Sequence, residues 1–197
     1  MGEDRVKTAL ERAMERAEGL GKITGDEIKR LEFVPLGTGI AARYLKEVGV
    51  DLEAELSKSK GTGNRKWVVQ GAQEALLANI NLPRDAGSRN TAKKALEGVV
   101  VIKENKKATK AVIAKIETLF NYYEQARAQL LRELRKDVEA RVQEMQKSMK
   151  YQVGSPQKME MEMQQQLQEE MRAAMSQLDG QYEPTLQEHK KELLKMV

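Results

Sequence analysis

The chain has 197 residues, a formal net charge of +4 at neutral pH, 32% charged residues and no cysteine. The lack of cysteine excludes disulfides, thiolate nucleophiles and cysteine-based metal or iron–sulfur sites. Every apolar run is shorter than the roughly 20 residues of a membrane-spanning helix, and the charged beginning of the chain lacks the apolar core of a secretory signal. We therefore expect a cytoplasmic protein with no membrane partner.

Strong helix formers dominate the composition, whereas aromatic residues make up only 4% of the chain. This mixture favours long, thin helices with narrow apolar seams over a thick core. We predict an all-α protein in two parts. Residues 1–104 form short helices, and residues 105–197 form a long antiparallel, coiled-coil-like helical hairpin.

The first two helices are predicted from an apolar stripe and a cap. The stripe has the 4-3-4-3 spacing of one helical face and consists of Val6, Leu10, Ala13, Ala17 and Leu20. Thr24 and Glu27 then have the spacing of a capping box, which opens a second helix. We expect Pro35 to end that helix, with a turn at Gly37-Thr38-Gly39, because proline cannot donate a helical hydrogen bond.

The rest of the N-terminal region is punctuated by glycine and proline. We predict helices over residues 40–48, 51–57, 65–80 and 91–102, and an exposed loop over residues 58–64. Ser88 or Asn90 is the expected N-cap of the last helix. Val99–Ile102 also has strand propensity, but no partner strand is evident, so we favour helix.

The C-terminal half contains two seams of apolar residues that run along two helices. A helix over residues 105–150 is roughly 68 Å long at a rise of 1.5 Å per residue. Gly154 and Pro156 predict a turn near residues 153–156, and a second helix follows. Eleven pairs of seam residues have numbers that add to 308 or 309, which predicts one antiparallel register. The pairs are Met149/Met159, Met145/Met163, Val142/Leu167, Val138/Met171, Leu134/Ala174, Leu130/Leu178, Ala126/Tyr182, Tyr123/Leu186, Leu119/His189, Ile116/Leu193 and Val112/Met196. We expect a kink or break at Gly180–Pro184.

A seam of only two helices leaves apolar edges uncovered. We expect the N-terminal helices to pack along the hairpin and a second copy to complete a four-helix bundle, so that the protein is a homo-oligomer, most simply a dimer.

The sequence identifies no catalytic, cofactor-binding or metal-binding residue. His189 is the only histidine, and it falls on the predicted seam, which favours a partly buried structural role. A di-iron bundle requires Glu-x-x-His twice, and no G-x-S-x-G elbow is present. The Gly61–Lys66 segment lacks the spacing of a phosphate-binding P-loop. Met159, Met163 and Met171 fall on the seam as core filler. We therefore expect no enzymatic activity and no cofactor.

A basic stretch is the clearest functional signal. Residues 58–115 carry thirteen Lys and Arg against four Asp and Glu. Lys103, Lys106, Lys107 and Lys110 are spaced as on one helical face, which would suit contacts with phosphates. The candidate nucleic-acid contacts are Arg84, Arg89, Lys93, Lys94, Lys103, Lys106, Lys107 and Lys110.

Several short segments resemble a bacterial family of uncharacterised all-helical proteins. They are Trp67–Asp85 (WVVQGAQEALLANINLPRD), Ala95–Val99 (ALEGV), Ile116–Tyr123 (IETLFNYY) and Thr8–Ala17 (TALERAMERA). The resemblance implies a prokaryotic cytoplasmic protein and brings no activity or ligand with it.

The sequence names no reaction, partner or pathway. The leading hypothesis is a non-enzymatic helical scaffold that binds an unknown protein partner and itself. The alternative is a nucleic-acid-associated protein that uses the basic stripe at residues 84–110.

Overall fold

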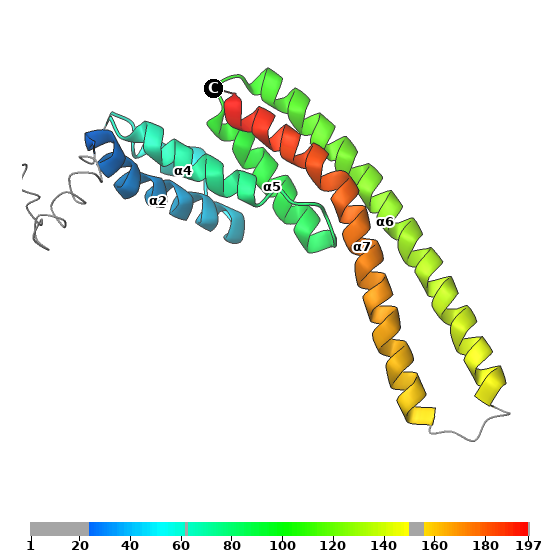
Figure 1. Cartoon of the computed structure of the whole chain (residues 1–197). Helices are drawn as coiled ribbons and strands as arrows, with labels where there is room; N and C mark the ends of the chain where they lie inside the picture. The colour runs from blue at the N-terminus through cyan, green and yellow to red at the C-terminus, as the bar shows by residue number, and fades with distance from the viewer. Residues whose placement is uncertain (1–23, 62, 150–155, 197) are drawn as a thin grey trace, which may run out of the picture.

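The computed structural model describes residues 24–61, 63–149 and 156–196, and all regular secondary structure in these ranges is α-helical. Four helices form a body: α2 (Gly25–Lys46), α3 (Leu52–Ser57), α4 (Arg65–Ala78) and α5 (Ala86–Ile102). Two long helices, α6 (Lys106–Met149) and α7 (Pro156–Lys195), run antiparallel and extend far beyond the body (Figure 1). The predicted all-α fold and long hairpin are confirmed. The predicted first helix and most of the predicted hairpin turn lie outside the described residues.

Helix α2 begins as predicted but continues past its proline. The Thr24 backbone N–H donates to the Glu27 carboxylate at 2.7 Å, and the Glu27 N–H donates to the Thr24 hydroxyl at 3.3 Å, which completes the capping box. The prediction that Pro35 ends the helix and that a turn follows is wrong, because α2 runs on to Lys46. Pro35 lies on the exposed side of α2, while the opposite side packs closely on α4, and this packing outweighs one lost hydrogen bond.

The remaining body helices follow the predicted order, with one corrected cap. The short helix α3 is capped by Asp51, whose carboxylate accepts the Ala54 N–H at 3.1 Å. Helix α5 begins at Ala86, earlier than predicted, and neither Ser88 nor Asn90 is its N-cap. Asp85 is the cap, and its carboxylate accepts the Ser88 N–H at 2.7 Å. The Val99–Ile102 run is helical, as favoured above.

One hydrophobic core runs through the body and continues into the end of the hairpin that the body covers. Helix α5 packs on α6, and α4 contacts α7. Phe120, which lies off the predicted seam, is 1% exposed because the body covers it. The seam side chains buried at this end are Val112, Ile116, Tyr123, Leu178, Leu186 and Leu193. The expected packing of the N-terminal helices on the hairpin is therefore present at this end.

Two contacts between α6 and α7 allow a comparison with the predicted register, expressed as the sum of the contacting residue numbers. The rings of Tyr123 and Tyr182 lie 5.4 Å apart, and their numbers add to 305. The ion pair between Arg141 and Glu170, at 2.7 Å, has numbers that add to 311. These values lie on either side of the predicted 308 to 309, less than one helical turn away.

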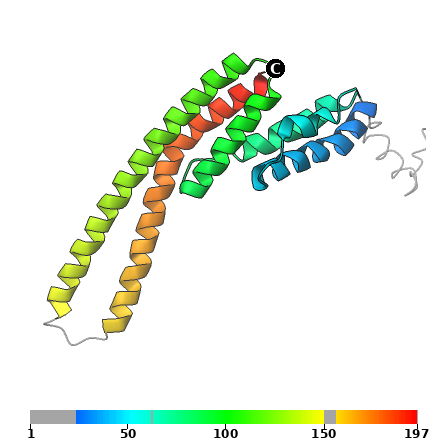
Figure 2. The same cartoon turned by 180° about the vertical axis from the view of Figure 1, so that it is seen from behind.

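Helix α7 passes through the expected defect without a break. Pro184 lies inside the helix, and α7 is continuous to Lys195. Both views show the axis of α7 bending along its length (Figures 1 and 2). Of the two predicted alternatives, a kink or a break, the break is therefore wrong, whereas a bent axis is compatible with a kink.

We use the name arm for the part of the hairpin beyond the body, residues 131–149 of α6 and 156–177 of α7. In the arm the two helices lie farther apart than beside the body (Figure 2). Leu134, Val138 and Leu167 are only half-buried, and Met171 is 45% exposed. None of the helices in the described part of the chain combines the length and apolar character required to cross a membrane.

Candidate functional site

The structure separates the eight basic residues that the sequence grouped together. Four of them hold the fold together, and their positive charges are directed at acceptors within the protein: Arg84, Arg89, Lys94 and Lys103. The remaining four are exposed: Lys93, Lys106, Lys107 and Lys110.

The predicted single face of four lysines is wrong. Helix α5 ends at Ile102 and α6 begins at Lys106, so Lys103 lies between two helices. Lys103 is 5% exposed, and its ammonium donates to the main-chain carbonyl of Met196 at the end of α7. Burial lowers the pKa of Lys103 below its ordinary value because the charged form loses hydration. This lysine ties the end of the hairpin to the body.

Lys94, a residue of α5, also joins two elements of the fold. Its ammonium donates to the carbonyls of Leu45 at 3.3 Å and Glu47 at 2.9 Å, and it lies 5.2 Å from the centre of the Tyr44 ring. The last carbonyls of a helix lack intrahelical partners and carry partial negative charge. Lys94 therefore binds the C-terminal end of α2 to α5.

The Arg89 guanidinium lies over the ring of Phe120, a residue of α6. Its guanidinium carbon lies 5.1 Å from the ring centre, and Nη2 donates to the Asn121 side chain at 3.0 Å. Nε lies 3.9 Å from the Glu124 carboxylate. Nη1 is buried and has no hydrogen-bond partner among the described residues.

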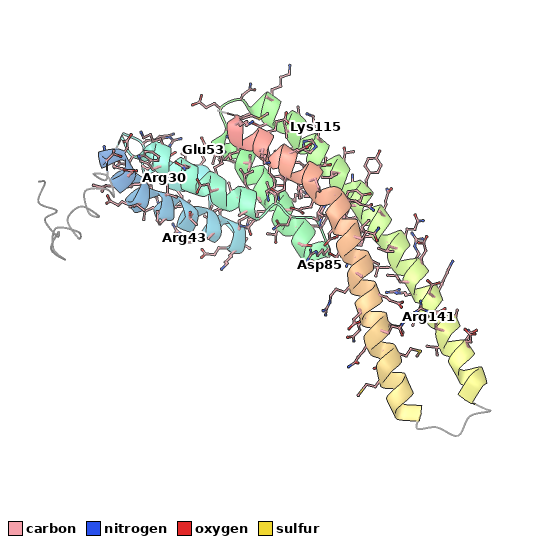
Figure 3. The ribbon with its side chains drawn as sticks, in the orientation of Figure 1. Arg30, Arg43, Glu53, Asp85, Lys115 and Arg141 are labelled. Carbon is pink, nitrogen blue, oxygen red and sulfur yellow. The ribbon has the colours of Figure 1, made fainter. Side chains whose placement is uncertain are left out.

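A cluster of charged and polar side chains joins the body to both long helices. We call this place the waist; Asp85, labelled in Figure 3, marks the body's side of it. The Arg84 guanidinium donates to Asp179 Oδ2 at 2.6 Å, and the Tyr123 hydroxyl donates to Asp179 Oδ1 at 2.6 Å. One carboxylate of α7 thus binds the α4–α5 connection and α6 together.

The same contacts shift the pKa values of the cluster. Asp179 raises the pKa of Arg84, which keeps the guanidinium charged. Burial, with the hydrogen bond to Asp179, raises the pKa of Tyr123 from 10.0 to about 12, so the phenol stays neutral and remains a donor.

A small cavity opens at the waist, with a volume of about 280 Å³. Arg84, Arg127 and Arg172 line it together with Tyr123 and Asp179. A second cavity, of about 420 Å³, adjoins it and shares Arg84 and Arg127. Arg127 and Arg172 were not predicted, because they lie outside the basic stretch and 45 positions apart in the sequence. Only the antiparallel pairing of α6 and α7 brings them to one cavity.

The arm contains an apolar groove between α6 and α7. Its volume is about 440 Å³, and Leu131, Leu134, Val138, Leu167 and Met171 form its apolar lining. Charges of both signs surround it, from Arg135, Asp137, Glu139 and Glu170.

Histidine-based and metal-based chemistry has no supporting group of side chains in the described part of the chain. His189 is half-buried, and its Nδ1 lies 3.7 Å from Glu192 on the next turn. Among the described residues, His, Asp and Glu side chains form no group of three or more that could hold a metal ion.

Comparison with family models matches residues 53–195 to DUF6657, a family of unknown function. The chain belongs to this family. No curated protein and no solved structure matches it.

The DUF6657 match begins in α3 and ends at the last residue of α7, so it contains the waist and the arm, while α2 precedes it. Three of the four segments that carried the resemblance fall within the match, and the resemblance to an uncharacterised family is confirmed.

Proposed function

We propose that this DUF6657 protein is a non-enzymatic cytoplasmic scaffold that self-associates through its arm. A second copy would lay its own arm antiparallel along the groove, so that α6 and α7 of both copies form a four-helix bundle. The observation that carries this proposal is the apolar groove that the arm leaves open to solvent, in a hairpin whose other end is closed by the body.

The charges around the groove favour a second copy as its occupant. A two-fold interface brings the same patch of both chains together, so a patch must carry both signs to match itself. With a two-fold axis near Asp137, Arg135 of each copy approaches Glu139 of the other. Both side chains line the groove. A phosphate backbone would instead meet Asp137, Glu139 and Glu170.

The first test introduces a charge inside and outside the groove. Val138→Asp places a carboxylate among the apolar lining, whereas Ala140→Asp places it on an exposed position of the same turn. Sedimentation velocity over a concentration series should show a dimer for the native chain and for Ala140→Asp. Val138→Asp should raise the dimer dissociation constant by about tenfold or more, equivalent to about 1.4 kcal/mol. A native chain that remains monomeric at every concentration contradicts the proposal.

The second test exchanges the charges. Arg135→Glu and Glu139→Arg should each weaken the dimer, because each creates two like-charge contacts, and the double variant should restore it. A double variant that is no better than the two single variants would exclude the proposed two-fold register.

A specific feature also supports nucleic-acid binding as a second candidate. Lys106, Lys107 and Lys110 are exposed in the opening turns of α6, where no acidic residue lies in the first turn. The positive end of the helix dipole adds to their charge. Mobility-shift assays with DNA and RNA at about 50 to 200 mM salt test this candidate. Binding should disappear in Lys106→Glu/Lys107→Glu/Lys110→Glu and persist in Arg132→Glu/Lys136→Glu, whose charges are exposed on the arm.

A further inference from the structure

The residues that line the smaller waist cavity carry more positive than negative charge. Three guanidinium groups line it, from Arg84, Arg127 and Arg172, and Asp179 is the only carboxylate among the lining residues. The lining therefore carries a formal charge of +2 (three positive groups less one negative group).

Asp179 is already engaged by other groups. Its two carboxylate oxygens accept hydrogen bonds from Arg84 and Tyr123, each at 2.6 Å. Within residues 24–61, 63–149 and 156–196, neither Arg127 nor Arg172 forms a salt bridge. These two guanidinium groups remain available to a ligand.

Two neighbouring acids, Asp85 and Glu124, have partners other than Arg172. Asp85 accepts the Ser88 N–H as the cap of α5, and Glu124 lies 3.9 Å from Arg89. Both acids line the adjoining cavity that Arg127 also reaches, and Arg127 contributes to lowering the pKa of Asp85, although less than the Ser88 hydrogen bonds do. Arg89 lines the adjoining cavity and not the smaller one, and its buried Nη1 has no partner among the described residues.

We propose that the waist binds a small phosphorylated anion, such as inorganic phosphate or a compact phosphomonoester, between Arg127 and Arg172. A guanidinium presents paired N–H groups that match two oxygens of a phosphoryl group. A phosphoryl dianion equals the +2 charge of the lining, whereas a carboxylate would neutralise only half of it.

The remaining lining residues suit this ligand. The Ser176 hydroxyl can donate to a third oxygen, and Met175 offers an apolar surface for the carbon next to the ester oxygen. The volume of about 280 Å³ fits a compact phosphate ester and not a folded nucleic acid.

Titration calorimetry with inorganic phosphate, glycerol phosphate and acetate tests the site in the full-length chain at low salt. Both phosphates should bind, and acetate should bind at least tenfold more weakly. Arg127→Gln/Arg172→Gln should reduce phosphate affinity at least tenfold. Arg132→Gln changes an exposed arginine five residues after Arg127 on α6 and should leave the affinity unchanged. Circular dichroism of each variant checks that the helices remain formed.

Two further measurements separate this site from general charge attraction. Phosphate should bind more tightly at pH 8 than at pH 6, because the dianion is the ligand. Equal affinities at the two pH values, or equal loss in Arg132→Gln, would overturn the proposal. A single-stranded oligonucleotide that binds when neither small phosphate does would also overturn it, and would point to the exposed lysines of α6 instead.

Discussion

Gly37 and Gly71 lie where α2 and α4 cross, and each presses against the backbone of the opposite helix. A Cβ atom on Gly37 would lie 1.8 Å from the carbonyl oxygen of Val68, and one on Gly71 would lie 2.0 Å from that of Val34. The Thr38 hydroxyl, 3.2 Å from the Val34 carbonyl oxygen, also lies 3.3 Å from that of Gly71. The two glycines therefore set the distance between the two helices.

We predict that Gly71→Ala destabilises the body by about 2–3 kcal/mol, because the two backbones must separate to admit a methyl group. Gly39→Ala, on the same helix α2 as Gly37, is the matched control, since nothing lies within 4 Å of the position that its methyl group would take. It should stabilise the protein by about 0.5–1 kcal/mol through helix propensity. Urea unfolding followed by circular dichroism measures both, and equal effects would contradict the close crossing.

Lys94 and Lys93 offer a comparison between a structural and a solvated lysine. Lys94→Met removes the donor to the Leu45 and Glu47 carbonyls and should cost about 1–2 kcal/mol. Lys93→Met changes an exposed neighbour and should alter stability by less than about 0.5 kcal/mol. Thermal and urea unfolding of both variants test this, and a loss of equal size in the two would show that Lys94 is not a helix anchor.

Tyr123→Phe should change how stability depends on alkaline pH. The pKa of Tyr123 is raised in the folded chain from 10.0 to about 12, so folding favours the neutral phenol. Its contribution is complete below pH 10 and is lost as the pH rises towards about 12. Between these values the native chain should lose more unfolding free energy than Tyr123→Phe. Parallel slopes would contradict a raised pKa of Tyr123 in the folded chain.

Backbone amides of the hairpin should exchange hydrogen more slowly beside the body than in the arm. Amides of residues 112–123 and 178–193 lie in segments with buried seam side chains, whereas residues 131–144 and 163–175 belong to the arm. We expect the arm of the monomer to exchange at least about tenfold faster, because fewer apolar contacts oppose local opening. Mass spectrometry of exchanged peptides measures this, and uniform protection along α6 in a monomer would contradict it.

The same experiment at high protein concentration has a separate expected result. Protection of residues 131–144 should increase if the arms pair, while residues 112–123 should change little because they are already buried.

Local rules in the sequence were sufficient for most helices. The capping box of Thr24 and Glu27, the Asp51 helix and the long α6 follow from signals within a few residues of each other, so they were predictable from the chain alone. The antiparallel pairing was also predictable, because two periodic seams on either side of a predicted glycine–proline turn can pair in few ways.

The failures occurred where contacts between distant segments outweighed a local signal. Pro35 does not end α2, because α4 packs along the opposite side of the helix at Gly37. Lys103 does not join the lysines of α6, because its ammonium is drawn into the interface to bind a carbonyl of α7. A local pattern carries no information on either partner.

The sequence by itself determined an all-helical chain with a long hairpin and a local excess of basic residues, because periodicity and caps act over a few residues. Only the tertiary structure decided which charges remain available. In the fold, Arg84 and Lys94 donate hydrogen bonds to acceptors of the protein itself. Arg127 and Arg172 come from different helices and line one cavity. Burial and pairing depend on neighbours that are distant in sequence, so the availability of a charge is a property of the packed fold.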